Sequence, residues 1–393
     1  MMRTVGTTAR GIRTPIVRRG DDLVNIVVDS LIQAATSSGF NIGDRDVLGI
    51  TESLLARAQG NYASAYDIST DIKQKFPSTI GIVFPILSRN RFSIILKGII
   101  DSGRDVVLLL SYPSDEVGNH LMDVDKMDEL KINPYTDVLT EKDYRRLFGD
   151  KVVHPFTGVD YVDVYKKIGN GKIKIVFSNN PRTILDYTKD VLVANVHERK
   201  RTKRILRETG ANILYDLSNI LNAPIEGSGY NPEYGLLGSN LASEKELKLF
   251  PRDSQIFVEE VQKKVKEKVG KDIEVMIYGD GAFKDPVGKI WELADPVVSP
   301  GYTEGLKGTP NELKLKYIVD TELSNMDKSD VSSAVKDKIS NKNNSADQSE
   351  SLGTTPRQLT DLLGSLCDLI SGSGDKGTPV VLVQGYFDNY ASE

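Results

Sequence analysis

An aspartate between two glycines, Asp280, directly follows an apolar run in the stretch IEVMIYGDG at residues 273–281. The apolar run predicts a buried strand that ends near Gly279. In open α/β sheets, ligands bind beyond the carboxyl ends of the strands, where a carboxylate can bind a divalent cation. Glycine and aspartate are also the ordinary residues of turns. The stretch therefore fits either a ligand site that uses Asp280 or a plain turn.

A glycine-rich segment, SGSGDKGTP at residues 371–379, joins a predicted helix to a predicted strand. Loops of this composition can turn several backbone N–H groups toward a phosphate, which makes Ser373, Gly374 and Asp375 candidate phosphate contacts. The segment lacks the GxxxxGK[ST] pattern of a Walker A loop, and glycine is also common in connectors. It fits a phosphate site or a flexible connector. A further stretch, YGLLGSNLAS, surrounds Asn240 with small residues that leave the backbone open to close approach.

A basic helix is predicted at residues 197–207. It carries six cations, which are Arg199, Lys200, Arg201, Lys203, Arg204 and Arg207. These side chains could contact nucleotide phosphates, a polyanionic substrate or nucleic acid, or they could form a solvated face paired with acidic neighbours. No aromatic residues are interleaved with them, which argues against a platform for single-stranded nucleic acid.

The elements that must position these residues alternate between strands and helices. Near the start of the chain, Asp21 or Asp22 can cap a helix, residues 47–51 predict a buried strand, and the next helix ends at Gly60. In the middle, STIGIVFPI, RDVVLLLSYP and GKIKIVFSNN predict further strands. A helix that closes at Gly270 leads to the strand before Asp280, and a helix at residues 356–370 leads to the strand PVVLVQG. The alternation predicts a mixed α/β fold with parallel strands.

The bulk properties exclude several classes of protein. A length of 393 residues suggests two or three domains. The net charge of −5 gives no indication of a nucleic-acid or membrane-surface partner. No apolar run reaches the roughly 18 residues of a spanning helix, and the opening residues lack the apolar core of a secretory signal. The single Cys367 allows no intrachain disulfide and has the pattern of a buried thiol, and three widely spaced histidines argue against a zinc hydrolase. We therefore expect a cytoplasmic protein.

Several short motifs, taken in order, resemble the coenzyme F(420)-0:L-glutamate ligases, the gamma-glutamyl ligases of deazaflavin biosynthesis. The family's GDDL helix start, DGDVLVV strand and SKAEG helix end resemble residues 20–23, 44–48 and 56–60. Its GIDASN and LLPxDPD stretches resemble residues 238–243 and 249–253. Its strand ending in TDTNGR resembles residues 278–281, and its late helix, glycine-rich loop and IPAVVVRG strand resemble residues 361–385. The resemblance covers about residues 1–62, 234–300 and 356–386.

The resemblance implies a domain organisation. A ligase core would consist of residues 1–65 and 231–393, with a mobile linker at residues 340–355. Residues 66–230, which lie outside the motifs, would form an inserted α/β domain. The fold class expected is therefore a gamma-glutamyl-ligase-like core with an inserted α/β unit, and the family implies a homodimer.

The resemblance also implies roles for single residues. In the family, strand-end carboxylates hold Mg²⁺ or Mn²⁺ against the phosphates of GTP, and K⁺ is a further cation to expect. Asp280 falls on one metal position, and Asn240 falls on the other, where an amide replaces the family's aspartate. Gly281 replaces a hydroxyl residue, and Ser373 replaces a glutamate. These departures point to a different substrate or to a relocated metal ligand, for which Asp375, Glu244 and Asp253 are the candidates.

The resemblance also implies which residues contact the nucleotide and which serve catalysis. Gly279, Gly281, Ser373, Gly374 and Asp375 would contact the nucleotide. Asp280 and Arg57 would serve catalysis. Outside the matched motifs, the basic helix is expected to turn cations such as Arg201 and Arg204 toward the active-site cleft, where a polyanionic acceptor could bind.

The chemistry that the resemblance implies is amide-bond formation between L-glutamate, or a similar amino acid, and a small carboxylate acceptor. Transfer of a γ-phosphoryl group to the acceptor makes an acyl phosphate that the amino group can attack, so the protein has mainly to position groups and neutralise charge. Neither nucleic acid nor a membrane is an expected partner. The alternative is a non-catalytic protein that binds a nucleotide or another phosphorylated ligand on the same fold, which Asn240 and Ser373 favour.

Overall fold

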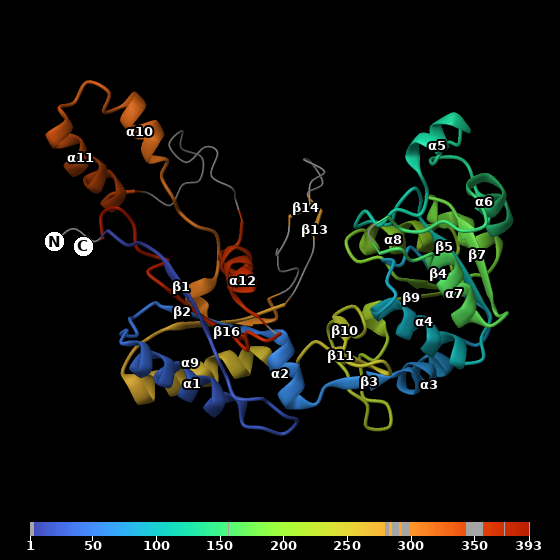
Figure 1. Ribbon diagram of the computed structural model, residues 1–393, viewed down its shortest axis with the longest axis horizontal. Helices are drawn as coiled ribbons and strands as arrows, with labels where there is room; N and C mark the ends of the chain where they lie inside the picture. The colour runs from blue at the N-terminus through green and yellow to red at the C-terminus, as the bar shows by residue number, and fades with distance from the viewer. Residues whose placement is uncertain are drawn as a thin grey trace. The chain divides into compact units, whose positions relative to one another are not determined.

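A computed structural model of the chain describes residues 4–155, 157–279, 283–284, 291–292, 299–342, 357–372 and 374–392. Its contacts divide into two compact units (Figure 1). Unit 1 consists of Met1–Leu55 and Asp253–Glu393, and unit 2 consists of Ala56–Arg252. Each unit has a sheet and apolar clusters of its own. The mixed α/β fold expected from the sequence is confirmed.

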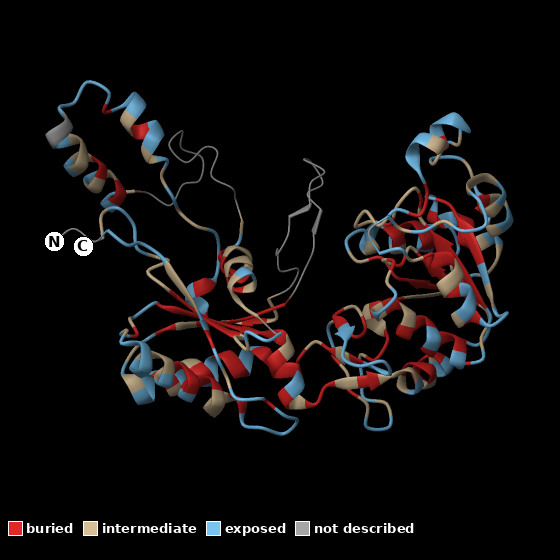
Figure 2. Ribbon diagram, viewed as in Figure 1, coloured by how far each residue is buried: buried red, intermediate tan, exposed pale blue. Residues whose placement is uncertain are grey.

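In the described part of unit 1, a five-stranded mixed sheet has the order β1-β16-β2-β12-β15. The strands are β1 (Thr8–Ile12), β16 (Val380–Gln384), β2 (Val47–Thr51), β12 (Glu274–Tyr278) and β15 (Gly301–Tyr302). Strands β2 and β12 run parallel, and β16 runs antiparallel to both of its neighbours. The central strands are buried almost throughout (Figure 2), which is why they appear in the sequence as continuous apolar runs.

Helices cover both faces of this sheet (Figure 1). Helix α12 (Leu359–Ile370) lies on one face, where its Leu363 and Cys367 pack against Val47 and Met276. Helix α9 (Ser254–Val269) lies on the other face and packs against α1 (Leu23–Ser38). The sequence signals at their ends are confirmed. Asp22 caps α1 by accepting a hydrogen bond from the N–H of Asn25, and Gly270 closes α9 with a φ of 72°.

The other elements of unit 1 are shorter. Helix α2 (Glu52–Gln59) follows β2 directly, ends before Gly60 as expected, and contains the division between the units. Helices α10 (Leu315–Thr321) and α11 (Lys328–Ser340) form a hairpin around their own apolar cluster. The remaining elements are β13 (Phe283–Lys284), β14 (Trp291–Glu292) and η3 (Glu304–Leu306). Most of the linker predicted at residues 340–355 lies outside the described residues.

Cys367 is buried, as expected, under the centre of the unit 1 sheet. A Cβ added at Gly49 would lie 2.5 Å from its Sγ atom, so the thiol fills its site tightly. Burial raises the pKa of the Cys367 thiol to about 12. The thiol is therefore protonated at pH 8, whereas the thiolate is the reactive form.

We therefore predict that Ellman's reagent reacts with Cys367 at least a hundredfold more slowly in the native chain than in guanidinium. The measurement is the rate of absorbance change at pH 8, and the unfolded chain, which has one cysteine, supplies the full amplitude. Equal rates in the two states would show that the thiol is accessible and ionised in the folded protein.

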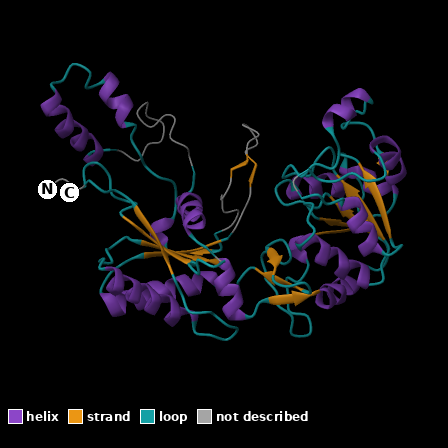
Figure 3. Cartoon of the chain, in the orientation of Figure 1, coloured by secondary structure: helices purple, strands orange, loops and turns teal. Residues whose placement is uncertain are grey.

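Unit 2 contains, within the described residues, a six-stranded sheet in the order β6-β7-β5-β4-β8-β9. Figure 3 shows helices and strands in both parts of the chain. The strands are β4 (Ile80–Val83), β5 (Val106–Leu110), β6 (Leu139–Thr140), β7 (Ile173–Phe177), β8 (Asp190–Val193) and β9 (Ile213–Asp216). All are parallel except β6 at the edge. If the parallel strands are numbered from 1 by their order in the chain, their order across the sheet is 3-2-1-4-5. This is the strand order of a doubly wound sheet.

The helices of unit 2 follow this winding. Helices α4 (Arg91–Asp101) and α7 (Tyr161–Gly169) contribute to the apolar cluster on one face, together with α3 (Ala65–Lys75), which packs on α4. The short η1 (Pro181–Asp186) and α8 (Arg199–Glu208) contribute Ile184 and Leu206 to the cluster on the other face. The basic helix therefore begins two residues later than predicted.

The remaining elements of unit 2 are α5 (Val124–Glu129), α6 (Glu141–Phe148) and η2 (Leu217–Asn219). A small antiparallel sheet is formed, among the described residues, by β10 (Ser239–Leu241), β11 (Glu246–Leu249) and β3 (Tyr62–Ser64). In the part of the chain that the structure describes, we find no helix with the length and hydropathy needed to span a bilayer.

Candidate functional site

Three strands of unit 1 end along one edge of its sheet. Thr51 and Tyr278, the last residues of β2 and β12, are directly paired. Val380, the first residue of the antiparallel β16, pairs with Ile50 of β2 and with Ile12, the last residue of β1. We call this the carboxyl edge. It is the place where sheets of this kind bind ligands.

The carboxyl edge brings together two of the stretches that the sequence singled out. The glycine-rich segment at residues 371–379 leads into β16, and the carbonyl of Pro379 accepts a hydrogen bond from the N–H of Thr51 at 3.1 Å. Gly279 follows β12 at the same edge and is buried. Asp280 and Gly281 come next in the chain and lie outside the described residues. The structure thus places the glycine-rich segment and the strand before Asp280 on the same edge, with β2 between them.

The glycine-rich segment forms a tight, closed turn. Gly372 and Thr378 exchange backbone hydrogen bonds, and the N–H of Gly377 bonds the carbonyl of Gly374 at 3.2 Å. Gly377 has a φ of 62°, which glycine adopts without strain. At the tip, Gly374, Asp375 and Lys376 are exposed. Their N–H groups donate no hydrogen bond within the described chain. Consecutive N–H groups of this kind are suited to phosphate oxygens. Ser373 lies outside the described residues.

Two further residues at the carboxyl edge have chemistry that the sequence analysis did not single out. Glu52, the first residue of α2, is only 2% exposed and follows Thr51 at the end of β2. Lys376 adds an exposed ammonium group at the tip of the glycine-rich turn. The sequence does contain a signal for each of them. Glu52 is an acidic residue where a predicted strand meets a predicted helix, and Lys376 is a lysine in a glycine-rich loop. The edge therefore supplies a buried carboxylate, a cation and backbone donors.

A metal site is not formed by the described residues. They contain no group of three or more His, Cys, Asp or Glu side chains that could hold a metal ion. Asn240 lies in β10 of unit 2, where it is exposed and its Oδ1 accepts from the N–H of Leu241 at 2.8 Å. Asp280, the other expected ligand, is outside the described residues, so we derive no step through a metal.

The candidates for a relocated metal ligand belong to different elements of the chain. Asp253 is exposed at the start of α9 in unit 1, and Asp375 is exposed at the tip of the glycine-rich turn. Glu244 is exposed between β10 and β11 in unit 2.

The predicted acceptor-binding arginines lie on α8 of unit 2. Arg204 pairs with Glu208 at 3.2 Å, and Arg201 lies 3.9 Å from Glu198. Lys203, on the same helix, is more buried and pairs with Asp216 at 2.8 Å. This local pairing supplies the acidic neighbours that the interpretation as a solvated face requires. Arg57 is exposed in the last turn of α2.

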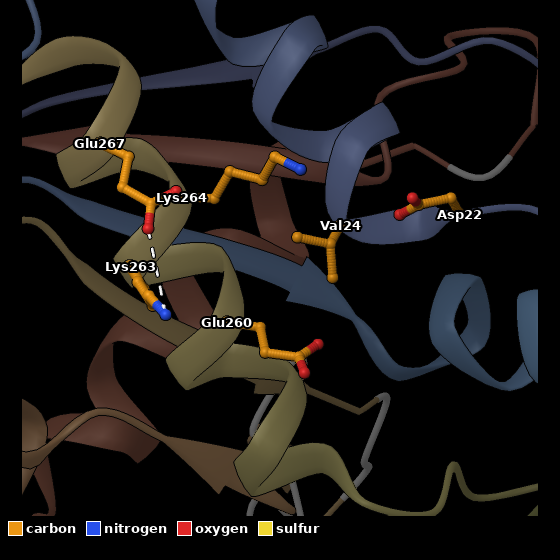
Figure 4. Close-up of a pocket in the computed structure, with 6 residues that line it drawn as sticks. All are labelled: Asp22, Val24, Glu260, Lys263, Lys264 and Glu267. Atoms are coloured by element: carbon orange, nitrogen blue, oxygen red, sulfur yellow. Dashed lines mark ion pairs between the residues drawn. The ribbon is translucent and has the colours of Figure 1, made fainter.

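A groove of about 290 Å³ lies between α1 and α9 (Figure 4). Figure 4 shows Glu260, Lys263, Lys264 and Glu267 projecting from α9, with Asp22 and Val24 at the start of α1. Lys263 lies 4.0 Å from Glu267, and both side chains are more than half exposed. The carboxylate of Asp22 is engaged in capping α1, and its hydrogen bond from the N–H of Asn25 lowers its pKa. One pair of these charges is solvated and locally paired and Asp22 is engaged as a cap, which makes the groove a poorer candidate than the carboxyl edge.

A mixed α/β core with a glycine-rich, phosphate-suited turn at its carboxyl edge is compatible with a nucleotide-using enzyme. Comparison with known families is more specific. The model of the F420-0:gamma-glutamyl ligase family matches residues 11–385, so the chain belongs to this family. The matched range runs through unit 2 as well as unit 1, and it confirms the resemblance drawn from the short motifs. A search of curated proteins found no match.

Proposed function

We propose that the chain is a cytoplasmic, GTP- and metal-dependent ligase that joins L-glutamate, or a similar amino acid, to a small carboxylate acceptor. Membership of the ligase family supports this class of reaction. The observation that carries the proposal is the glycine-rich turn at the carboxyl edge, whose tip presents the N–H groups of Gly374, Asp375 and Lys376. By family resemblance, we propose that the active form is a homodimer.

The reaction we propose has two steps. An oxygen of the acceptor carboxylate attacks the γ-phosphorus of the nucleotide, the nucleoside diphosphate leaves, and an acyl phosphate results. The amine of the amino acid then attacks the acyl carbon, inorganic phosphate leaves, and the nitrogen loses a proton. Such a reaction needs fixed donors around the phosphates more than covalent participation by the protein.

The residues of the carboxyl edge have matching roles in this scheme. The N–H groups of the glycine-rich turn and the ammonium of Lys376 would hold phosphate oxygens. The buried carboxylate of Glu52 would hold the amino group of the incoming amino acid. Asp280 would hold Mg²⁺ or Mn²⁺, which neutralises phosphate charge when bound. We retain Arg57 as a catalytic candidate, and Arg201 and Arg204 as candidates for the acceptor.

An assay with labelled acceptor acids tests the proposal. The full chain would be incubated with GTP or ATP, Mg²⁺ or Mn²⁺, K⁺, L-glutamate and a panel of small carboxylic acids carrying ¹⁸O in the carboxylate. We expect phosphate release that requires both an acid and L-glutamate, with one ¹⁸O atom transferred to each phosphate. Phosphate released without the label would contradict the acyl phosphate.

A non-catalytic binding protein is the second candidate. Asn240 favours it, because an exposed amide stands where the family has a metal-binding aspartate, and Ser373 replaces a family glutamate. In the same assay, this candidate predicts nucleotide binding without phosphate release for every acid in the panel.

A further inference from the structure

A second groove, of about 390 Å³, runs along α1 in unit 1. The helix and its N-cap contribute polar and apolar side chains, which are Asp22, Asn25, Ile26, Asp29, Ser30 and Gln33. The chain between β1 and α1 contributes Pro15, Ile16 and Asp21. The volume is within the usual range for small-molecule sites, which is roughly 300–1,000 Å³. The proposed ligase chemistry makes no use of this groove.

Ser30 lines the groove with a hydroxyl group that lacks a protein partner. The residue is only 7% exposed, and its Oγ atom makes no hydrogen bond with any residue that the structure describes. Two other hydroxyl groups of α1 are satisfied by the helix itself. Thr36 donates to the carbonyl of Ile32 at 2.9 Å, and Ser37 donates to that of Ala34 at 3.3 Å. A buried hydroxyl without a partner is costly, and a ligand in the groove would supply one.

The charged side chains that line the groove are all acidic. Asp21 accepts from a backbone N–H at 2.6 Å, and Asp22 accepts from the N–H and Nδ2 of Asn25 at 3.1 and 2.5 Å. These donors are uncharged, and neither carboxylate forms an ion pair within the described chain. Asp29 differs, because it pairs with Lys268 at 2.6 Å. The uncompensated negative charge is therefore at the end of the groove where α1 begins.

An apolar surface lies between this acidic end and Ser30. Ile16 is 81% exposed, although isoleucine is usually buried, and Ile26 is partly buried on α1. Ser30 comes eight residues after Asp22, which corresponds to about 12 Å along the helix. A ligand that fits all three features has a cation at one end, an aliphatic chain of about nine bonds at this spacing, and a hydrogen-bonding group at the other end.

We propose that this groove binds an aliphatic polyamine, for which spermidine is the probe of suitable length. A terminal ammonium group contacts the carboxylates of Asp21 and Asp22. The methylene groups cover Ile16 and Ile26. A nitrogen at the other end donates to the hydroxyl of Ser30, which can accept as well as donate. The acidic lining disfavours an anion, and a neutral ligand would leave the charge of the two aspartates uncompensated.

Calorimetry on the full chain in about 0.15 M NaCl, where long-range attraction between exposed charges is screened, tests the site. Nucleotides are omitted, because polyamines bind their phosphates. We expect spermidine to bind with one-to-one stoichiometry. The diamine 1,4-diaminobutane is too short to reach from Asp21 to Ser30, so it should bind at least fivefold more weakly. The diol 1,8-octanediol has a similar length to spermidine and no charge, and it should not bind.

Three variants test the two polar contacts. Asp21→Asn should weaken spermidine binding at least tenfold, because it removes the charge and keeps an acceptor for the backbone N–H. Ser30→Ala should weaken binding several-fold without lowering the melting temperature, because alanine favours the helix and the lost hydroxyl has no described partner. The control Asp128→Asn removes an exposed carboxylate of α5 in unit 2, outside the groove, and should leave the affinity unchanged.

Four results would each overturn the proposal. The first is that spermidine does not bind. The second is equal affinity in Asp21→Asn and Asp128→Asn, which would show that the amine binds acidic surfaces in general. The third is unchanged affinity in Ser30→Ala, and the fourth is diaminobutane binding as tightly as spermidine, since both contradict a ligand that lies along α1. The ligase assay contains no polyamine, so the two proposals fail independently.

Discussion

Replacement of Asp280 by alanine is expected to lower the rate of the proposed ligase reaction by about a thousandfold. Asp280 comes two residues after the end of β12, next to the buried Gly279 at the carboxyl edge. Removal of a preorganised group that stabilises developing charge typically costs a factor of about 10²–10³. The loss of a metal ligand adds to this, because a bound cation contributes several kcal/mol to charge stabilisation. Binding of GTP in the presence of Mn²⁺ should be lost as well.

Asp272→Ala is the matched control, because it removes an exposed aspartate just before the opposite end of the same strand, where its partner is Lys266. We expect its rate and its nucleotide affinity to stay within about twofold of the wild type, since a single surface ion pair contributes little. Circular dichroism of both variants should match the native spectrum, because both changes lie outside the strand Glu274–Tyr278. Full nucleotide affinity in Asp280→Ala would remove Asp280 from the site.

The local features of the fold could be predicted from the sequence because their causes are local. Asp22 caps α1 through a residue three positions on, and Gly270 ends α9 because it takes a left-handed φ. Buried strands such as β2 and β5 are continuous apolar runs. The order of the strands in a sheet, in contrast, has no local cause. The position of β16 between β1 and β2 joins residues about 370 apart in the chain, and no local pattern records such a pairing.

The candidate site was predictable only in part. The glycine-rich turn and Asp280 were visible as strand-end patterns, and general rules place such ends along one edge of a sheet. Glu52 was not visible, because burial of a carboxylate depends on the elements that cover it. The family resemblance groups Asn240, which belongs to unit 2, with Asp280, which follows a strand of unit 1, and this grouping stays a prediction. The doubly wound order in unit 2 was predicted only as an α/β layer.

Asn61 shows most clearly how a single side chain can hold distant segments together. It is fully buried, and its Nδ2 donates to the carbonyls of Tyr230 at 3.0 Å and Phe250 at 2.7 Å. Its Oδ1 accepts from the N–H of Tyr230 at 2.9 Å and from Nη1 of Arg252 at 2.5 Å. One amide thus uses all of its hydrogen-bonding capacity on residues 169 and more positions away, all within unit 2.

Asn61→Ala is therefore expected to destabilise unit 2 by about 4 kcal/mol, because each buried polar group left without a partner costs about 1–3 kcal/mol. This is a large part of the roughly 5–15 kcal/mol that stabilises a typical domain. Urea titration followed by circular dichroism measures the change. Hydrogen exchange should show lost protection at residues 228–232 and 248–252. The control Asn240→Ala removes an exposed amide, so its effect should stay within about 0.5 kcal/mol. If Asn61→Ala unfolds at the same urea concentration as Asn240→Ala, water replaces the lost hydrogen bonds, and Asn61 does not join these segments.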